Sequence, residues 1–113
     1  MRHRGNLFSQ GEAPAEGETM DALLLHRNLR IERILSSARI ESTHYQQAQD
    51  EWVVLIEGRA LLDVEGETLE LKRGDYLFLP GGTPHRVVEV SQGALWLAVH
   101  LYPDDRPGSD DAT

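Results

Sequence analysis

Nitrogen and oxygen donors that could bind a metal ion are concentrated in residues 44–51. His44 and Gln46 are two residues apart, so on an extended strand their side chains lie on one face. Glu51 opens the next apolar run after a four-residue link, and its carboxylate can therefore lie opposite them. A divalent ion needs three or four such donors within about 2.0–2.3 Å of one point. The types and spacing of these residues predict metal chemistry.

Another donor, His85, follows the rigid segment 80–84, which reads PGGTP. An apolar run precedes this segment, and a β-branched run begins at His85 itself. Two prolines and two glycines cannot continue a central ladder, because proline lacks the N–H and glycine adds backbone freedom that suits a loop. The loop is expected to place the imidazole at the start of the returning strand, where a ligand can reach it.

The segment from Gly74 to His85 resembles the second motif of the cupin family, G(X)5PXG(X)2H, with Pro80 and Gly82 at the intervening positions. The resemblance covers residues 22–102. It implies an all-β fold, a jelly-roll barrel made of two packed antiparallel sheets.

The segment from His44 to Gly58 resembles the first cupin motif in part, since Glu51 and Gly58 keep its E(X)6G spacing. Many cupins hold one metal ion inside the barrel through histidines and a glutamate. The resemblance therefore implies a divalent ion (iron, manganese, nickel or zinc) bound by His44, Gln46, Glu51 and His85.

Three positions depart from the family pattern. Gln46 stands where the pattern has a second histidine, Ala38 where it has a glycine, and Glu89 where it has an asparagine. A glutamine carbonyl is a neutral and weaker donor than imidazole. The departures leave a metal-free barrel open as the alternative.

His100 is a further candidate, because it shares strand parity with Trp96 and Ala98 and could point into the barrel as a ligand or base. Each candidate also has a purely structural interpretation. His85 could cap its loop, Glu51 could pair with Arg86, and the remaining polar side chains could be solvated.

About nine short apolar runs separated by turns, without a helical period, are typical of an all-β sandwich or barrel. The run Val53–Ile56 is apolar on both faces, which favours a homodimer that covers its outer side. The clearest expected strands are Leu23–Leu25, Leu29–Leu35, Trp52–Ile56, Ala60–Val64, Thr68–Leu71, Tyr76–Leu79, His85–Val90 and Ala94–His100.

Composition limits the remaining possibilities. The 113 residues suit one domain, and the absence of cysteine excludes disulfides and thiolate metal sites. A net charge of −8 argues against a nucleic-acid partner, and no apolar stretch is long enough to span a membrane, so a cytoplasmic protein is expected. Residues 1–21 are expected to form a flexible leader, in which Leu7–Phe8 could dock on the barrel. Residues 103–113 are expected to form a disordered acidic tail.

Besides a structural subunit whose outer sheet is the functional surface, two functions remain open from the sequence. The first is a metal-dependent cupin acting on a small polar molecule as an oxygenase, isomerase or lyase, with two imidazoles and a carboxylate around the ion. The second is a metal-free barrel that binds or senses a small ligand. No nucleophile motif or glycine-rich phosphate loop supports covalent or nucleotide chemistry.

Overall fold

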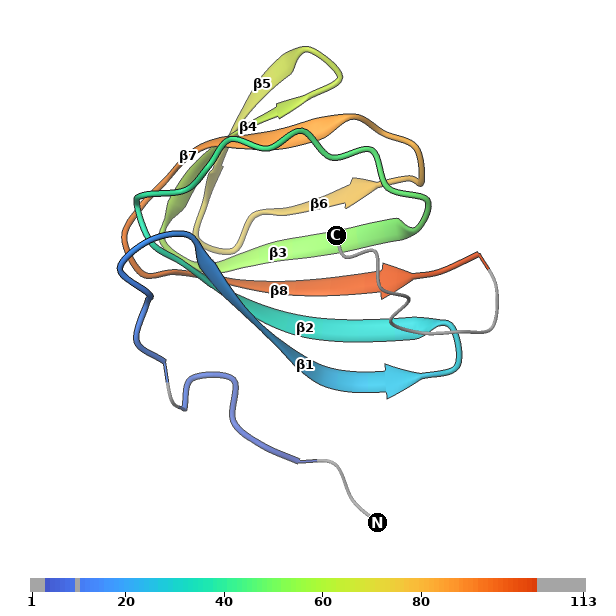
Figure 1. The fold of residues 1–113 in the computed structure, drawn as a ribbon, viewed down its shortest axis with the longest axis horizontal. Helices are drawn as coiled ribbons and strands as arrows, with labels where there is room; N and C mark the ends of the chain where they lie inside the picture. Colours follow the sequence, from blue (N-terminus) through green and yellow to red (C-terminus); the bar gives the residue numbers. More distant parts are fainter. Residues whose placement is uncertain (1–3, 10, 104–113) are drawn as a thin grey trace.

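The structure is a computed structural model that describes residues 4–9 and 11–103. Two antiparallel sheets pack face to face, so the expected jelly-roll fold is confirmed (Figure 1). One sheet has five strands in the order β1-β2-β8-β3-β6, and the other has three in the order β5-β4-β7. The strands are β1 (Glu18–His26), β2 (Leu29–Ser36), β3 (Asp50–Glu57), β4 (Arg59–Val64), β5 (Glu67–Lys72), β6 (Tyr76–Leu79), β7 (His85–Val90) and β8 (Ala94–Leu101).

The described residues form eight strands rather than about nine, because the segment between β2 and β3 stays largely irregular. This segment runs beside β7 and touches it through one isolated bridge, in which Tyr45 and His85 exchange both backbone hydrogen bonds at 2.8 and 2.9 Å. The bridge decides which side chains of the segment face the barrel interior.

Apolar side chains from both sheets meet in the core. Leu55 of β3 and Ala98 of β8 are fully buried, and Leu62 of β4 packs against them from the other sheet. The indole N–H of Trp96 donates to the Ser36 hydroxyl at 3.1 Å, so this large side chain is buried without an unsatisfied donor.

The first strand begins at Glu18, inside the segment expected to be a flexible leader. Composition alone pointed to a leader because residues 18–21 carry little apolar surface, but their backbone pairs with β2 from Glu18↔Ser36 onward. An ion pair at 2.8 Å between Asp21 and Arg33 adds to the pairing. The barrel therefore starts before residue 22.

The leader also contacts the barrel next to its apolar pair, of which Leu7 is half-buried. The Arg33 guanidinium donates to the carbonyls of Leu7 and Ser9 at 3.1 and 2.7 Å, whereas the Phe8 side chain is 66% exposed. The backbone rather than the aromatic ring is what holds this part of the leader. The expected acidic tail lies, from residue 104 onward, outside the described residues.

The outer face of the five-stranded sheet carries exposed aromatic side chains. Tyr76 and Phe78 of β6 are 67% and 55% exposed, and Trp52 of β3 packs beside Tyr76 with ring centroids 5.5 Å apart. Across residues 4–9 and 11–103, no helical segment has the length and apolar character needed to span a bilayer.

Candidate functional site

A cavity of about 70 Å³ lies between the two sheets. Strands of both sheets and the β2–β3 segment line it, and its apolar walls come from methionine, isoleucine, valine, leucine and tryptophan side chains. A larger open cleft of about 470 Å³ shares three lining residues with it, so the cavity opens into the cleft. The polar lining residues of the cavity are Glu18, Glu32, Tyr45, Gln47, Glu51 and His85.

His85 opens β7 after the Pro/Gly loop, and its side chain is 9% exposed. Its Nδ1 lies 2.9 Å from the carbonyl oxygen of Thr83. A carbonyl can only accept, so Nδ1 carries the hydrogen, and in the neutral form of the ring the lone pair lies on Nε2. Nε2 lies 4.0 Å from Glu51, beyond hydrogen-bond distance, and is therefore available to a ligand in the cavity.

Gln47 holds the Glu51 carboxylate in place. Its amide Nε2 donates to Glu51 Oε1 at 2.8 Å, while its own Oε1 is buried without a hydrogen-bond partner among the described residues. An ionised carboxylate only accepts, so the amide cannot be turned round without bringing two oxygens together. A buried unpaired oxygen costs about 1–3 kcal/mol, and a donor group on a ligand would remove that cost.

Two of the predicted metal ligands lie outside the cavity. His44 and Gln46 are exposed, and the Gln46 amide donates to the Gly82 carbonyl at 3.2 Å on the loop surface. The Tyr45–His85 bridge sets this arrangement, because alternation of side chains then turns the residues on either side of Tyr45 outward. The prediction was therefore wrong by one residue: Tyr45 and Gln47 face the cavity, not His44 and Gln46.

The sequence reasoning missed Tyr45 and Gln47 as cavity residues. Counting back from Glu51 in steps of two reaches both of them and never reaches His44 or Gln46, but the count holds only once the backbone bridge between Tyr45 and His85 is known. Glu18 was missed for another reason, since it lay in the presumed leader.

The predicted set of four ligands therefore does not fit a divalent ion. Glu51 and His85 come together, but the described residues contain no group of three histidine, cysteine, aspartate or glutamate side chains that could hold one. Gln47 and Tyr45 also line the cavity, but a neutral amide and a neutral phenol are weaker donors.

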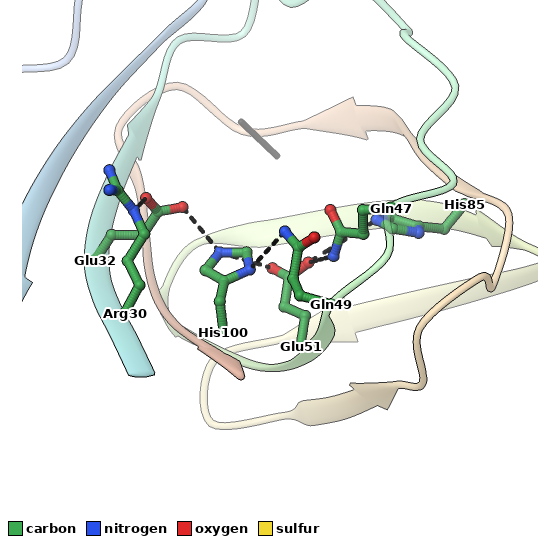
Figure 2. A network of polar contacts seen from close by, with 7 residues as sticks. All are labelled: Arg30, Glu32, Gln47, Gln49, Glu51, His85 and His100. Atoms are coloured by element: carbon green, nitrogen blue, oxygen red, sulfur yellow. Dashed lines mark hydrogen bonds and ion pairs between the residues drawn. The ribbon is translucent and has the colours of Figure 1, made fainter. Parts of the chain in front are cut away.

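His100 lies behind the cavity and belongs to a buried polar network across β2, β8 and β3 (Figure 2). Its Nε2 donates to Glu32 Oε1 at 3.0 Å, and its Nδ1 faces the amide of Gln49 at 3.3 Å. The same Nε2 lies 4.0 Å from Glu51 Oε2. His100 is fully buried and does not line the cavity, so it can act on the site only through its two glutamate neighbours.

Glu32 is held in its charged form by this network. Burial alone would raise the pKa of Glu32, but hydrogen bonds from His100 and from Arg30 outweigh burial and keep the pKa below its usual value of 4.5. The Arg30 guanidinium donates to its second oxygen at 3.0 Å. Both oxygens of Glu32 are thus paired inside the barrel.

Burial shifts two other cavity groups toward their neutral forms. The pKa of Glu18 is raised mainly by burial and further by the charges of Glu32 and Glu51, although the Ser36 hydroxyl donates to it at 3.0 Å. The pKa of Tyr45 is raised by burial and by the charges of Glu18 and Glu51. Tyr45 therefore stays a phenol that can donate a hydrogen bond at neutral pH.

The Pro/Gly loop packs directly on the segment that carries Gln47. A side chain at Gly81 would place Cβ 2.3 Å from the Ala48 carbonyl oxygen, and the N–H of Gly82 donates to the Gln47 carbonyl at 2.7 Å. Close approach of the two backbones thus fixes the position of Gln47 relative to His85.

The substitution Gly81→Ala is expected to lower the free energy of unfolding by about 3 kcal/mol, because the added methyl group must push one backbone away from the other. Gly82→Ala is the control: it meets no atom within 4 Å but has φ of +84°, so it should cost only about 1 kcal/mol. Urea unfolding of both variants measures the difference. A smaller loss for Gly81→Ala than for Gly82→Ala would contradict the packing described.

Comparison with known proteins gives a consistent family assignment. Residues 31–100 match the family model described as cupin domain. A solved structure from Ralstonia eutropha, of a protein proposed to be a mannose-6-phosphate isomerase, has a TM-score of 0.79 and 35% identity over 88% of this chain and 97% of that chain.

Two curated relatives are of unknown function. A protein of Methanocaldococcus jannaschii is 30% identical over 60 residues, which cover 53% of this chain and 48% of the relative. A protein of Streptomyces coelicolor is 28% identical over 101 residues, which cover 86% of this chain and 96% of the relative. The chain therefore spans about half of the first relative and nearly all of the second.

Proposed function

This chain belongs to the cupin family, and we propose that it binds a small polar molecule between its sheets and moves a proton on that molecule, with His85 as the general base. One observation carries the proposal. The Thr83 carbonyl fixes the hydrogen of His85 on Nδ1, which leaves the Nε2 lone pair to the cavity.

The groups around His85 fit an isomerisation next to a carbonyl. His85 Nε2 takes a proton from the carbon beside the carbonyl, and the electron pair of that C–H bond moves onto the carbonyl oxygen. The Tyr45 hydroxyl, which burial keeps protonated, can donate to this oxygen as its charge develops. The Glu51 carboxylate, 4.0 Å from Nε2, stabilises the imidazolium that forms. In an α-hydroxycarbonyl substrate the proton then returns from Nε2 to the former carbonyl carbon, while the proton of the hydroxyl on the first carbon moves to the former carbonyl oxygen, which completes the isomerisation.

The shape of the site limits the size of the reacting group. The cavity of about 70 Å³ admits only a few non-hydrogen atoms, whereas the adjoining cleft of about 470 Å³ can hold the rest of the molecule. The walls of the cavity are mainly apolar, which disfavours water next to the proton transfer. The class of reaction agrees with the isomerase activity proposed for the Ralstonia relative.

No step of this proposal passes through a metal ion, because His44 and Gln46 face outward and leave Glu51 and His85 without a third strong ligand. Iron, manganese, nickel or zinc at this site would need a rearrangement of the β2–β3 segment. The other function open from the sequence, a barrel that only binds its ligand, shares the cavity but needs no base.

Proton exchange in heavy water distinguishes these functions without knowledge of the natural substrate. The protein is incubated with dihydroxyacetone, hydroxyacetone or aminoacetone in D2O, and loss of the C–H signal beside the carbonyl is followed by proton NMR. We expect exchange above the buffer rate with at least one of them, unchanged by a chelator. No exchange with any of them would reject catalysis of this class. Exchange that appears only after a divalent ion is added would reject the metal-free site.

The expected homodimer stays a prediction. The exposed aromatic side chains on the outer face of the five-stranded sheet, Trp52, Tyr76 and Phe78, are where a second copy would pack, and light scattering at high protein concentration would detect it.

A further inference from the structure

The polar groups of the cavity are mostly hydrogen-bond acceptors that lack donors. Gln47 Oε1 is buried without a partner among the described residues, and His85 Nε2 presents a lone pair. The Glu51 carboxylate accepts a hydrogen bond from Gln47 and has four lone-pair positions. Among the described residues that line the cavity, the donors that remain are the Tyr45 hydroxyl and the second N–H of the Gln47 amide, since the Trp96 N–H is used by Ser36. A ligand that supplies donors would satisfy this set.

The carboxylates give the lining of the cavity a negative charge. Three glutamates, Glu18, Glu32 and Glu51, line the cavity, and none of the arginines or lysines that the structure describes does. Among the described residues only Glu32 of the three has an arginine within hydrogen-bond distance, Arg30 at 3.0 Å.

The open cleft next to the cavity is also lined mainly by acidic side chains. Glu16, Glu18 and Glu41 line it, and Arg39 is its one basic residue among those that the structure describes. An anion entering from the cleft would meet carboxylates in the cleft and again in the cavity, and its burial beside them would be strongly disfavoured.

Glu18 is the residue that connects the two spaces, since it lines both the cleft and the cavity. Its charged form is disfavoured by burial and by the other two glutamates, as the raised pKa shows. An uncompensated carboxylate in such a place costs stability, and a cation bound next to it would offset that cost.

We propose that the ligand of this site is a small molecule carrying a protonated amine, whose ammonium group lies among Glu18, Gln47 and Glu51. The inference rests on the proposed function and names its substrate class. The ammonium group has three N–H donors, which match the two carboxylates and the orphaned amide oxygen. A phosphorylated substrate, such as the one implied for the Ralstonia relative, does not suit this lining.

Three probes of similar size test the charge preference. Ethanolamine, ethylene glycol and glycolate are cationic, neutral and anionic at pH 7, and inorganic phosphate serves as a second anion. Each is titrated into protein labelled with ¹⁵N, and shifts of the Gln47 side-chain amide and of the His85 ring report binding in the cavity. Ethanolamine is expected to bind about tenfold more tightly than the other probes.

Glu18→Gln provides the matched variant, because glutamine keeps the size of the side chain and can still accept from Ser36. It should weaken ethanolamine binding about tenfold and leave ethylene glycol binding unchanged. Glu67→Gln, on the exposed edge strand β5, makes the same change of charge away from the site and should alter neither.

The stability of Glu18→Gln checks that its effect is not misfolding. Because the folded pKa of Glu18 lies above 4.5, the stability that goes with its protonated form is complete below pH 4.5 and lost as the pH rises through the folded pKa. Glutamine avoids that loss, so the variant should have a higher Tm than the natural protein at pH 7 and no such advantage at pH 4. A lower Tm at pH 7 would contradict the account of Glu18.

The outcomes separate this inference from the proposed function. Glycolate or phosphate that shifts the His85 ring at least as strongly as ethanolamine would overturn the cationic ligand and leave the base in place. Ethanolamine binding that Glu18→Gln does not weaken would also overturn it. No shift of the His85 ring with any probe would overturn the binding site itself and the inference with it.

Discussion

Replacing His85 by glutamine is expected to slow proton exchange on the responsive ketone by about 10²–10⁴-fold. Glutamine has a similar length and can hydrogen-bond the Thr83 carbonyl, but it offers no basic nitrogen to the cavity. Because the base acts on the proton and not on the rest of the ligand, the loss should fall on kcat, with KM changed much less. Proton NMR of the exchange in D2O measures both kcat and KM.

His44→Gln is the matched control, since His44 is the exposed histidine that the sequence placed in the same site. It should exchange protons at the rate of the natural protein. Equal exchange rates for His85→Gln and the natural protein would show that a group other than His85 takes the proton. A large loss in His44→Gln would show that the β2–β3 segment faces the cavity with the opposite parity.

The second large effect is expected for His100→Ala, which should lower the free energy of unfolding by about 3–5 kcal/mol. The substitution removes the 3.0 Å partner of Glu32, whose side chain is 1% exposed, and leaves a void between β2 and β3. Arg30 would then be the remaining neighbour of a buried carboxylate. Urea unfolding at pH 7 measures the loss.

A second variant separates loss of the charge partner from loss of packing. In the double substitution Glu32→Leu with His100→Leu, apolar side chains replace both partners, so the protein should be more stable than His100→Ala alone. Glu70→Ala is the surface control, because its ion pair with Arg59 is 68% and 75% exposed on the two side chains and contributes little. A loss below about 1 kcal/mol for His100→Ala would contradict the buried network.

Much of the fold could be predicted because strands and turns carry local signals. The apolar run Tyr76–Leu79 and the loop after it predicted β6 and the turn into β7. The first strand could not be placed correctly, because Glu18–Asp21 has a leader's composition and is held by pairing with a distant strand. Pairing with a distant strand does not produce a recognisable pattern in the local sequence.

The site could be predicted only where a motif fixes the geometry. His85 and Glu51 do lie together, since each begins a strand and the two sheets face each other. His44 and Gln46 were assigned by assuming a strand that does not form, and a shift of one residue exchanges the inside and outside of any extended segment. The backbone bridge between Tyr45 and His85 determines which side chains of the segment face the cavity. This bridge is a tertiary contact, so it could not be predicted from the spacing of residues in the sequence.

The central claim is that His85 offers an unprotonated Nε2 to the cavity, and the ¹⁵N NMR spectrum of its ring tests this most directly. In protein labelled at histidine, with His85→Gln used to assign the resonance, we predict the neutral ring with hydrogen on Nδ1 and a free Nε2, unchanged when zinc or manganese is added. A neutral ring with hydrogen on Nε2, or coordination of Nε2 by the added metal, would contradict the account.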